Sequence, residues 1–171
     1  MTNRQLHKVS KEKLMKIAQP KRRKHSCIQT WNATPDKAFP LLCPVRETDW
    51  IPDWDPKLVV SNSGVMELDC LFIEPDTPND AIWIVTRYDP NRFVEMYRTA
   101  PAVTVSKFSI TLDEAKDGTT RAFISYEHTA LSNEGEKAVN NFTSEHFNEL
   151  MNHFEAAINH YLSTGQKITA L

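Results

Sequence analysis

The C-terminal stretch SNEGEKAVNNFTSEHFNELMNHFEAAINHYLS, residues 132–163, decides the fold. Its apolar side chains recur at helical spacing and fall on one broad arc of a helical wheel. They are Val139, Phe142, Phe147, Leu150, Met151, Phe154, Ala157, Ile158 and Tyr161. Ser132 and Glu134 suit the start of a helix, and Gly165 suits its end. The stretch predicts one long helix over residues 132–163 that needs a broad apolar surface to lie on.

Short apolar runs separated by turn residues precede this helix. We expect seven strands, over residues 25–31, 58–61, 66–73, 82–88, 93–99, 103–112 and 120–129. Dividers such as Lys116-Asp117-Gly118 are typical of hairpins, so consecutive strands should pair antiparallel. Phe108, Ile110 and Leu112 alternate with polar residues, which indicates a sheet with one better-packed face. This face is the surface we expect the helix to cover.

Between the first two strands, Thr34 and Pro35 suit the start of a short helix that Pro44 ends. The following residues, 45–56, are rich in Trp, Pro and acidic residues and too irregular for a long helix.

The net charge of -2 is unevenly distributed over the 171 residues. Residues 1–25 hold nine basic residues and one acidic residue, Glu12, so this part carries +8 and the remainder -10. We therefore divide the chain into a basic arm (1–24), one domain (25–165) and a tail (166–171). The arm is either a solvated tail, an amphipathic helix docked on an anionic surface or on the acidic body, or a nucleic-acid contact. The acidic body predicts no nucleic-acid partner for the domain.

Several classes of chemistry have no support in the composition. The four glycines are isolated, which excludes phosphate-binding loops and dinucleotide fingerprints. Cys27, Cys43 and Cys70 form no C-x-x-C pair and suit an apolar core in a reducing compartment. No run is long and apolar enough to span a bilayer or to act as a signal peptide. We expect a soluble cytoplasmic protein without a cofactor.

A stripe of His146, Glu149, His153 and His160 follows one edge of the helical arc. Adjacent members could chelate a metal ion, but residues seven apart lie about 10.5 Å apart along a helix axis. We therefore predict a polar border with i,i+4 pairs, and no metal site.

The sequence resembles the SRPBCC superfamily, also called START-like, which includes the birch pollen allergen type and polyketide cyclases. The resemblance covers about residues 25–163 and rests on the stretches ATPDKAFPLL (33–42), ETDWIPDW (47–54), WIVTRYDP (83–90) and YEHTALSNEG (126–135). It implies an α+β helix-grip fold, in which a curved seven-stranded antiparallel sheet wraps around the C-terminal helix. It also implies an apolar cavity between the sheet and this helix.

For this implied cavity we predict a set of ligand contacts and no catalytic residue. The set is Trp50, Trp54, Tyr88, Met96, Tyr126, His128, Phe147, Met151 and Phe154. Trp50 and Trp54 either cover one end of the core or gate the entrance. Tyr126 and His128 share a strand face and either pack on the helix or carry polar chemistry. The faces of Trp83, Arg87, Glu95 and Arg98 stay open, because a one-residue slip exchanges the two sides of a sheet.

The leading hypothesis for function is the binding of a small hydrophobic or amphipathic molecule, such as a lipid or an aromatic, polyketide-like compound. One alternative is a cyclase or dehydratase that uses Tyr126 and His128. Another is an interaction module, as in chaperone-associated relatives, with the basic arm as its docking element.

Overall fold

The computed structural model describes residues 17–169 of the chain. The hypotheses for residues 1–16 of the basic arm therefore lie outside the described part. Within it, no helix is both long enough and apolar enough to cross a membrane.

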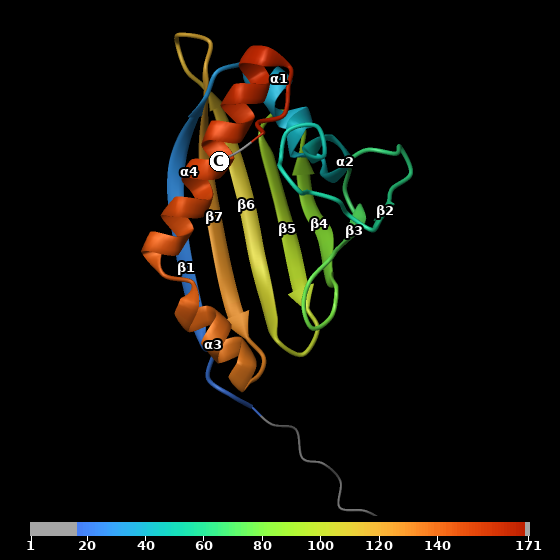
Figure 1. Ribbon diagram of the computed structural model, residues 1–171, viewed down its shortest axis with the longest axis vertical. Coiled ribbons are helices and arrows are strands. Elements are labelled where there is room, and N and C mark those ends of the chain that lie inside the picture. Colours follow the sequence, from blue (N-terminus) through green and yellow to red (C-terminus); the bar gives the residue numbers. More distant parts are fainter. Residues whose placement is uncertain (1–16, 170–171) are drawn as a thin grey trace, which may run out of the picture.

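The strands form one antiparallel sheet in the order β1-β7-β6-β5-β4-β3-β2, which confirms the predicted seven-stranded sheet. Their bounds are β1 Arg22–Trp31, β2 Leu58–Val60, β3 Leu71–Glu74, β4 Ala81–Asp89, β5 Phe93–Ala100, β6 Thr104–Glu114 and β7 Thr120–Ala130. Figure 1 shows two helices along the β1–β7 side of one sheet face and short helices at one end of it. The helix-grip fold is thereby confirmed.

Two strands differ from their predicted bounds by more than two residues. β1 begins at Arg22, three residues before the predicted start, because Arg22 to Lys24 pair with the end of β7. The predicted strand over residues 66–73 is reduced to β3, which begins at Leu71. Asp69 has a left-handed backbone with φ 64°, and the Cys70 amide bonds the Glu67 carbonyl. This turn ends regular pairing before β3 begins.

The register assigns each strand residue to a face, because directly opposite residues point to the same side. One row across the helix-covered face runs Phe72, Trp83, Arg98, Ser106, His128 and Arg23. The next row runs Val85, Met96, Phe108, Tyr126 and His25. Glu95, Lys107 and Arg87 lie on the opposite face, where Lys107 pairs with Glu95 at 2.7 Å.

The short helix predicted after β1 is split into two pieces, α1 (Pro35–Ala38) and the 3-10 helix η1 (Phe39–Leu42). Thr34 is the N-cap residue by its backbone, although its side chain makes no capping hydrogen bond. Cys43 is extended, and Pro44 both ends this turn and begins a further helix, α2 (Pro44–Glu47). The fixed φ of proline is compatible with the first helical position, so Pro44 starts α2 without strain.

The prediction of one continuous terminal helix was wrong. The segment forms α3 (Asn133–Asn141) and α4 (Ser144–Thr164), separated at Phe142, whose backbone (φ -78°, ψ 68°) is not helical. Thr143 caps α4 by accepting a hydrogen bond from the His146 amide. The predicted cap residues Ser132 and Gly165 are confirmed at the outer ends. Leu150, expected within the apolar arc, is 43% exposed.

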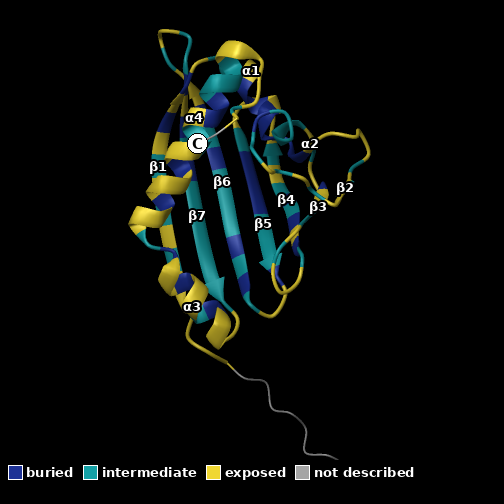
Figure 2. Ribbon diagram, in the orientation of Figure 1, coloured by how far each residue is buried: buried dark blue, intermediate teal, exposed yellow. Residues whose placement is uncertain are grey.

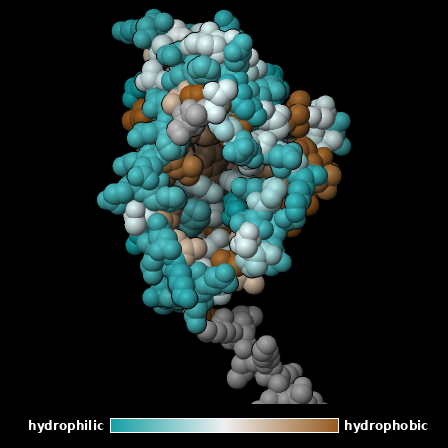
Figure 3. Space-filling view, in the orientation of Figure 1, coloured by the Kyte–Doolittle hydropathy of each residue, from teal (hydrophilic) through white to brown (hydrophobic). Residues whose placement is uncertain are grey.

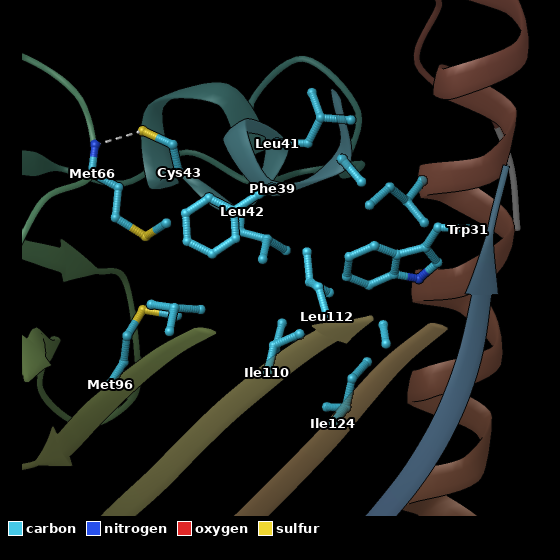
Figure 4. Close-up of a cluster of buried hydrophobic side chains, with 14 of the residues drawn as sticks. Trp31, Phe39, Leu41, Leu42, Cys43, Met66, Met96, Ile110, Leu112 and Ile124 are labelled. Atoms are coloured by element: carbon cyan, nitrogen blue, oxygen red, sulfur yellow. Dashed lines mark hydrogen bonds between the residues drawn. The ribbon is translucent and has the colours of Figure 1, made fainter. Parts of the chain in front are cut away.

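The core lies between the sheet, η1 and α4. Figure 4 shows side chains from these elements converging, with Trp31 on β1 beside α4 and Phe39 and Leu42 over the sheet. Cys43 belongs to this core, and its sulfur accepts a hydrogen bond from the Met66 amide at 3.1 Å. Figure 2 shows that α3 and α4 are exposed on their outer sides. Burial on one side only is what the amphipathic sequence of α4 requires.

Candidate functional site

The helix-covered face of the sheet is not completely filled by α4. A pocket of about 190 Å³ remains between the sheet, α2 and α4. Its lining is mostly apolar: Ile51, Trp54, Phe72, Trp83, Met96, Phe108, Leu150, Met151 and Phe154, together with Glu47 and Tyr126. In Figure 3 this face of the molecule is hollowed, and apolar residues lie within the hollow.

Aromatic rings in mutual contact form one wall of this pocket, two from the sheet and one from the segment after α2. Phe72 and Trp83 stack in parallel with ring centroids 5.4 Å apart, and Trp54 meets Phe72 edge-on at 6.0 Å. The Trp54 indole N–H also donates to the Pro44 carbonyl at 2.8 Å. Rings held by neighbours on several sides keep their positions, so this wall is formed before any ligand arrives.

The helix side is held in place by polar contacts between α4 and β1. Gln29, which is buried, donates to the Met151 carbonyl at 2.6 Å and accepts from the Trp31 indole N–H at 2.8 Å. Farther along α4, the Asn159 side chain accepts from the Asn32 amide and donates to the Thr30 carbonyl. These bonds fix the distance between α4 and the sheet, and hence the depth of the pocket.

Glu47 is the acidic residue of the pocket. It is the last residue of α2, and Ile51 continues the turn because its amide bonds the Glu47 carbonyl. Among the described residues, no group makes a hydrogen bond with the Glu47 side chain. Burial raises the pKa of this carboxyl to about 8, and the negative charge of Glu74 adds to the effect. Glu47 is therefore mainly protonated at neutral pH, and its side chain is an O–H donor and a carbonyl acceptor.

Tyr126 is the second polar group of the lining. Its ring packs against Phe108 at 5.2 Å and Phe142 at 5.6 Å. Burial raises the pKa of the hydroxyl, so Tyr126 stays protonated. Within residues 17–169, the hydroxyl has no hydrogen-bond partner. The pocket therefore holds two unpartnered polar groups in an otherwise apolar lining.

A polar cluster lies beside the pocket, toward α3. Arg98 pairs with Glu74 at 2.8 Å and with Asp76 at 2.6 Å, and Glu74 also accepts from the Trp83 indole N–H. His128 shares a 2.6 Å hydrogen bond with the Ser106 hydroxyl. Burial lowers the pKa of His128 to about 4, and the positive charge of Arg98 contributes. The imidazole is therefore neutral at pH 7.

A second hollow of about 340 Å³ opens on the other side of this cluster. Its lining includes Arg98, His128, Glu134 and His146, together with the loop over residues 76–79. Tyr126 and His128, with ring centroids 4.4 Å apart, stand between this polar hollow and the apolar pocket.

The predicted ligand contacts are divided among several places. Trp54, Met96, Tyr126, Met151 and Phe154 line the apolar pocket together. The remaining four lie elsewhere: Trp50 is fully buried against Phe154, Phe147 is buried against His25 and Phe142, Tyr88 lines a hollow with Arg87, and His128 lines the polar hollow.

Sequence reasoning did not select Glu47, although it lies in the quoted stretch 47–54. The spacing Glu47, Ile51, Trp54 is helical and would have placed the three on one side of a turn. The stripe from His146 to His160 lies on the solvent side of α4, and its first three members are exposed. In the part of the chain that is described, no three His, Cys, Asp or Glu side chains are placed to hold a metal ion.

No protein-family model matches the sequence, and no curated protein matches it. Solved structures do resemble the fold. Norcoclaurine synthase from Thalictrum flavum, in complex with dopamine and hydroxybenzaldehyde, gives a TM-score of 0.60 at 11% identity over 88% of this chain and 96% of that chain. A Staphylococcus aureus protein of unknown function gives a TM-score of 0.61 at 12% identity over 85% of this chain and 96% of that chain.

A protein of the dynemicin biosynthetic locus gives a TM-score of 0.57 at 12% identity over 84% of this chain, which spans 48% of that protein. At these identities the likeness concerns the fold alone. It supports the helix-grip architecture that the sequence resemblance implied.

Proposed function

We propose that this protein binds a small, mainly apolar aromatic molecule in the pocket between the sheet, α2 and α4. The observation that carries the proposal is the aromatic, preformed lining with only two polar groups, Glu47 and Tyr126. Ligand sites typically combine an apolar wall with a few polar groups that orient the ligand.

The volume limits the size of the ligand. A cavity of about 150 Å³ in an engineered protein holds benzene, and pockets for drug-sized molecules measure about 300–1,000 Å³. At about 190 Å³ the pocket suits a molecule with one aromatic ring and a short substituent. A long lipid chain would require α4 to move. Norcoclaurine synthase, which has a similar fold, is in complex with the one-ring compounds dopamine and hydroxybenzaldehyde, and these ligands are of the size proposed here.

We favour binding over a cyclase that uses Tyr126 and His128. His128 is bonded to Ser106, and its lowered pKa makes it a weak base near neutral pH. Its side chain also lines the polar hollow instead of the apolar pocket.

Isothermal titration with one-ring aromatic compounds tests the proposal. Met151→Trp fills the pocket from α4 and should weaken binding at least 10-fold. Ile82→Trp is the matched control, because Ile82 is 43% exposed on the far face of the sheet and the same bulk there should leave binding unchanged.

Trp54→Ala gives an independent test in the opposite direction. Removing this ring enlarges the pocket, so the variant should bind two-ring compounds such as naphthalene more tightly than the wild type does. The proposal fails if no one-ring compound binds the wild type, or if Met151→Trp and Ile82→Trp bind such compounds equally well.

A further inference from the structure

Resting on the proposed function, we propose that Glu47 and Tyr126 select an uncharged aromatic ligand that carries a carbonyl group. The two side chains line the same pocket from opposite directions, Glu47 from the end of α2 and Tyr126 from β7. A one-ring ligand that fills a pocket of about 190 Å³ contacts the residues that line it, Glu47 and Tyr126 included. Both are unpartnered among the described residues.

Hydrogen-bond chemistry points to an acceptor on the ligand. A protonated carboxyl and a phenol hydroxyl both donate an O–H, and a carbonyl oxygen has two lone pairs to accept them. Glu47 and Tyr126 are both partly buried, so water can solvate their O–H groups while the pocket is empty. A purely hydrocarbon ligand would displace this water and leave the two donors without an acceptor, which costs free energy. An aryl ketone or aldehyde removes it while its ring contacts Trp54, Phe72 and Trp83.

The charges around the pocket disfavour an ionic ligand. Glu74 on β3 forms an ion pair with Arg98. Its negative charge still raises the pKa of Glu47, and it would likewise repel an anionic ligand in the pocket. α4 contributes only Leu150, Met151 and Phe154 to the lining, and its acidic and histidine side chains lie outside the pocket. A ligand carboxylate or ammonium would lose its hydration without a fixed counter-ion, because Glu47 holds its proton at neutral pH.

A matched pair of ligands separates this inference from the proposed function. Acetophenone and α-methylstyrene have the same shape and differ in one position, where C=O replaces C=CH₂. At pH 7 we expect acetophenone to bind the wild type about 10-fold more tightly, the effect of one or two net hydrogen bonds. Benzoate and benzylamine should bind more weakly than acetophenone.

Variants at the two positions assign the preference. Glu47→Leu should reduce the ratio of the acetophenone affinity to the α-methylstyrene affinity to about threefold or less, and Tyr126→Phe should reduce this ratio partly. Glu47→Gln, which keeps an N–H donor, should retain most of it. Above pH 8, Glu47 ionises and the wild-type preference should fall, whereas that of Glu47→Gln should not.

The outcomes are distinct for the two proposals. If neither compound binds the wild type, the proposed function fails and this inference with it. If both bind with equal affinity, or if benzylamine or benzoate binds more tightly than acetophenone, the pocket binds aromatic rings but the selection by Glu47 and Tyr126 is wrong. If Glu47→Leu keeps the full preference, Glu47 is not the selecting group.

Discussion

Replacing Glu47 by glutamine should stabilise the protein by about 3 kcal/mol at pH 7 and by almost nothing at pH 4.5. In the unfolded chain this carboxyl loses its proton above its ordinary pKa of 4.5, whereas in the folded chain it keeps the proton until about pH 8. Between these values the folded state binds more protons, so the stability of the wild type falls as the pH rises. The loss levels off about one pH unit above the folded-state pKa, near pH 9.

The magnitude follows from the size of the pKa shift. Each unit corresponds to about 1.4 kcal/mol, and the shift from 4.5 to about 8 gives a full penalty of about 5 kcal/mol, reached near pH 9. Glutamine has nearly the same shape and no charge to lose. The side chain of Glu47 makes no hydrogen bond among the described residues, so the substitution breaks no hydrogen bond there.

Urea unfolding followed by tryptophan fluorescence at pH 4.5, 7 and 9 measures the effect, since Trp50 and Trp83 are buried. Glu149→Gln is the matched control, because Glu149 is exposed on α4 and its carboxyl remains in water in both states. The reasoning is refuted if the difference between Glu47→Gln and the wild type is the same at all three pH values. A difference that grows toward low pH would refute it equally.

Two further predictions concern other parts of the fold. The wild type should lose up to about 3 kcal/mol of stability as the pH falls from 6.5 to 4, because burial lowers the pKa of His128 to about 4 and only the unfolded chain takes up a proton in that window. His128→Gln should remove this loss. Urea unfolding at pH 4 and 7 measures it, and the same pH dependence in variant and wild type would contradict the prediction. Gly135→Ala should lower the free energy of unfolding by about 2–3 kcal/mol, because the added Cβ would lie 2.0 Å from the Val103 carbonyl oxygen; equal urea midpoints for variant and wild type would count against this contact.

Local patterns were sufficient to predict most of the sheet. Turn residues and alternation are properties of neighbouring positions, so the strands that follow hairpins were placed within a few residues. The start of β1 was missed because Arg22, Arg23 and Lys24 carry no apolar alternation. Their strand conformation comes from pairing with β7, more than a hundred residues away. A long-range partner of this kind leaves no local signal.

The faces of β4 could not be derived from alternation alone. The register shifts between Val85 and Arg87, which marks a bulge. Strict alternation would put Arg87 beside Trp83 and Val85 on the helix-covered face. The bulge instead places Arg87 opposite Glu95 on the far face and Tyr88 opposite Val94 on the near one. One extra residue in a strand reverses the sides that follow it.

Glu47 was missed for a different reason. An acidic residue at the end of a short helix is ordinarily solvated, and nothing in its own neighbourhood reveals an apolar pocket. The pocket is built by Phe72, Trp83 and Tyr126, which lie 25 or more positions away in the chain. The chemistry of the site therefore depends on packing that the sequence pattern does not describe.

The break between α3 and α4, which the prediction of one continuous helix missed, also affects the geometry of the site. In a continuous helix the Phe142 carbonyl would bond an amide one turn later. Here it faces β1 instead and lies 2.9 Å from the His25 ring nitrogen and 3.4 Å from the Arg23 guanidinium. The same bend turns the Phe142 ring against His128 at 4.2 Å and Tyr126 at 5.6 Å.

Arg23 and His25 on β1 thus replace the helical hydrogen bond that the Phe142 carbonyl does not make. Because these bonds hold Phe142 against Tyr126, the wall between the apolar pocket and the polar hollow depends on the break. In a continuous helix the Phe142 carbonyl would be used within the helix, and the Phe142 ring would lose this support for its packing on Tyr126 and His128. The bend between α3 and α4 therefore contributes to the separation of the apolar pocket from the polar hollow.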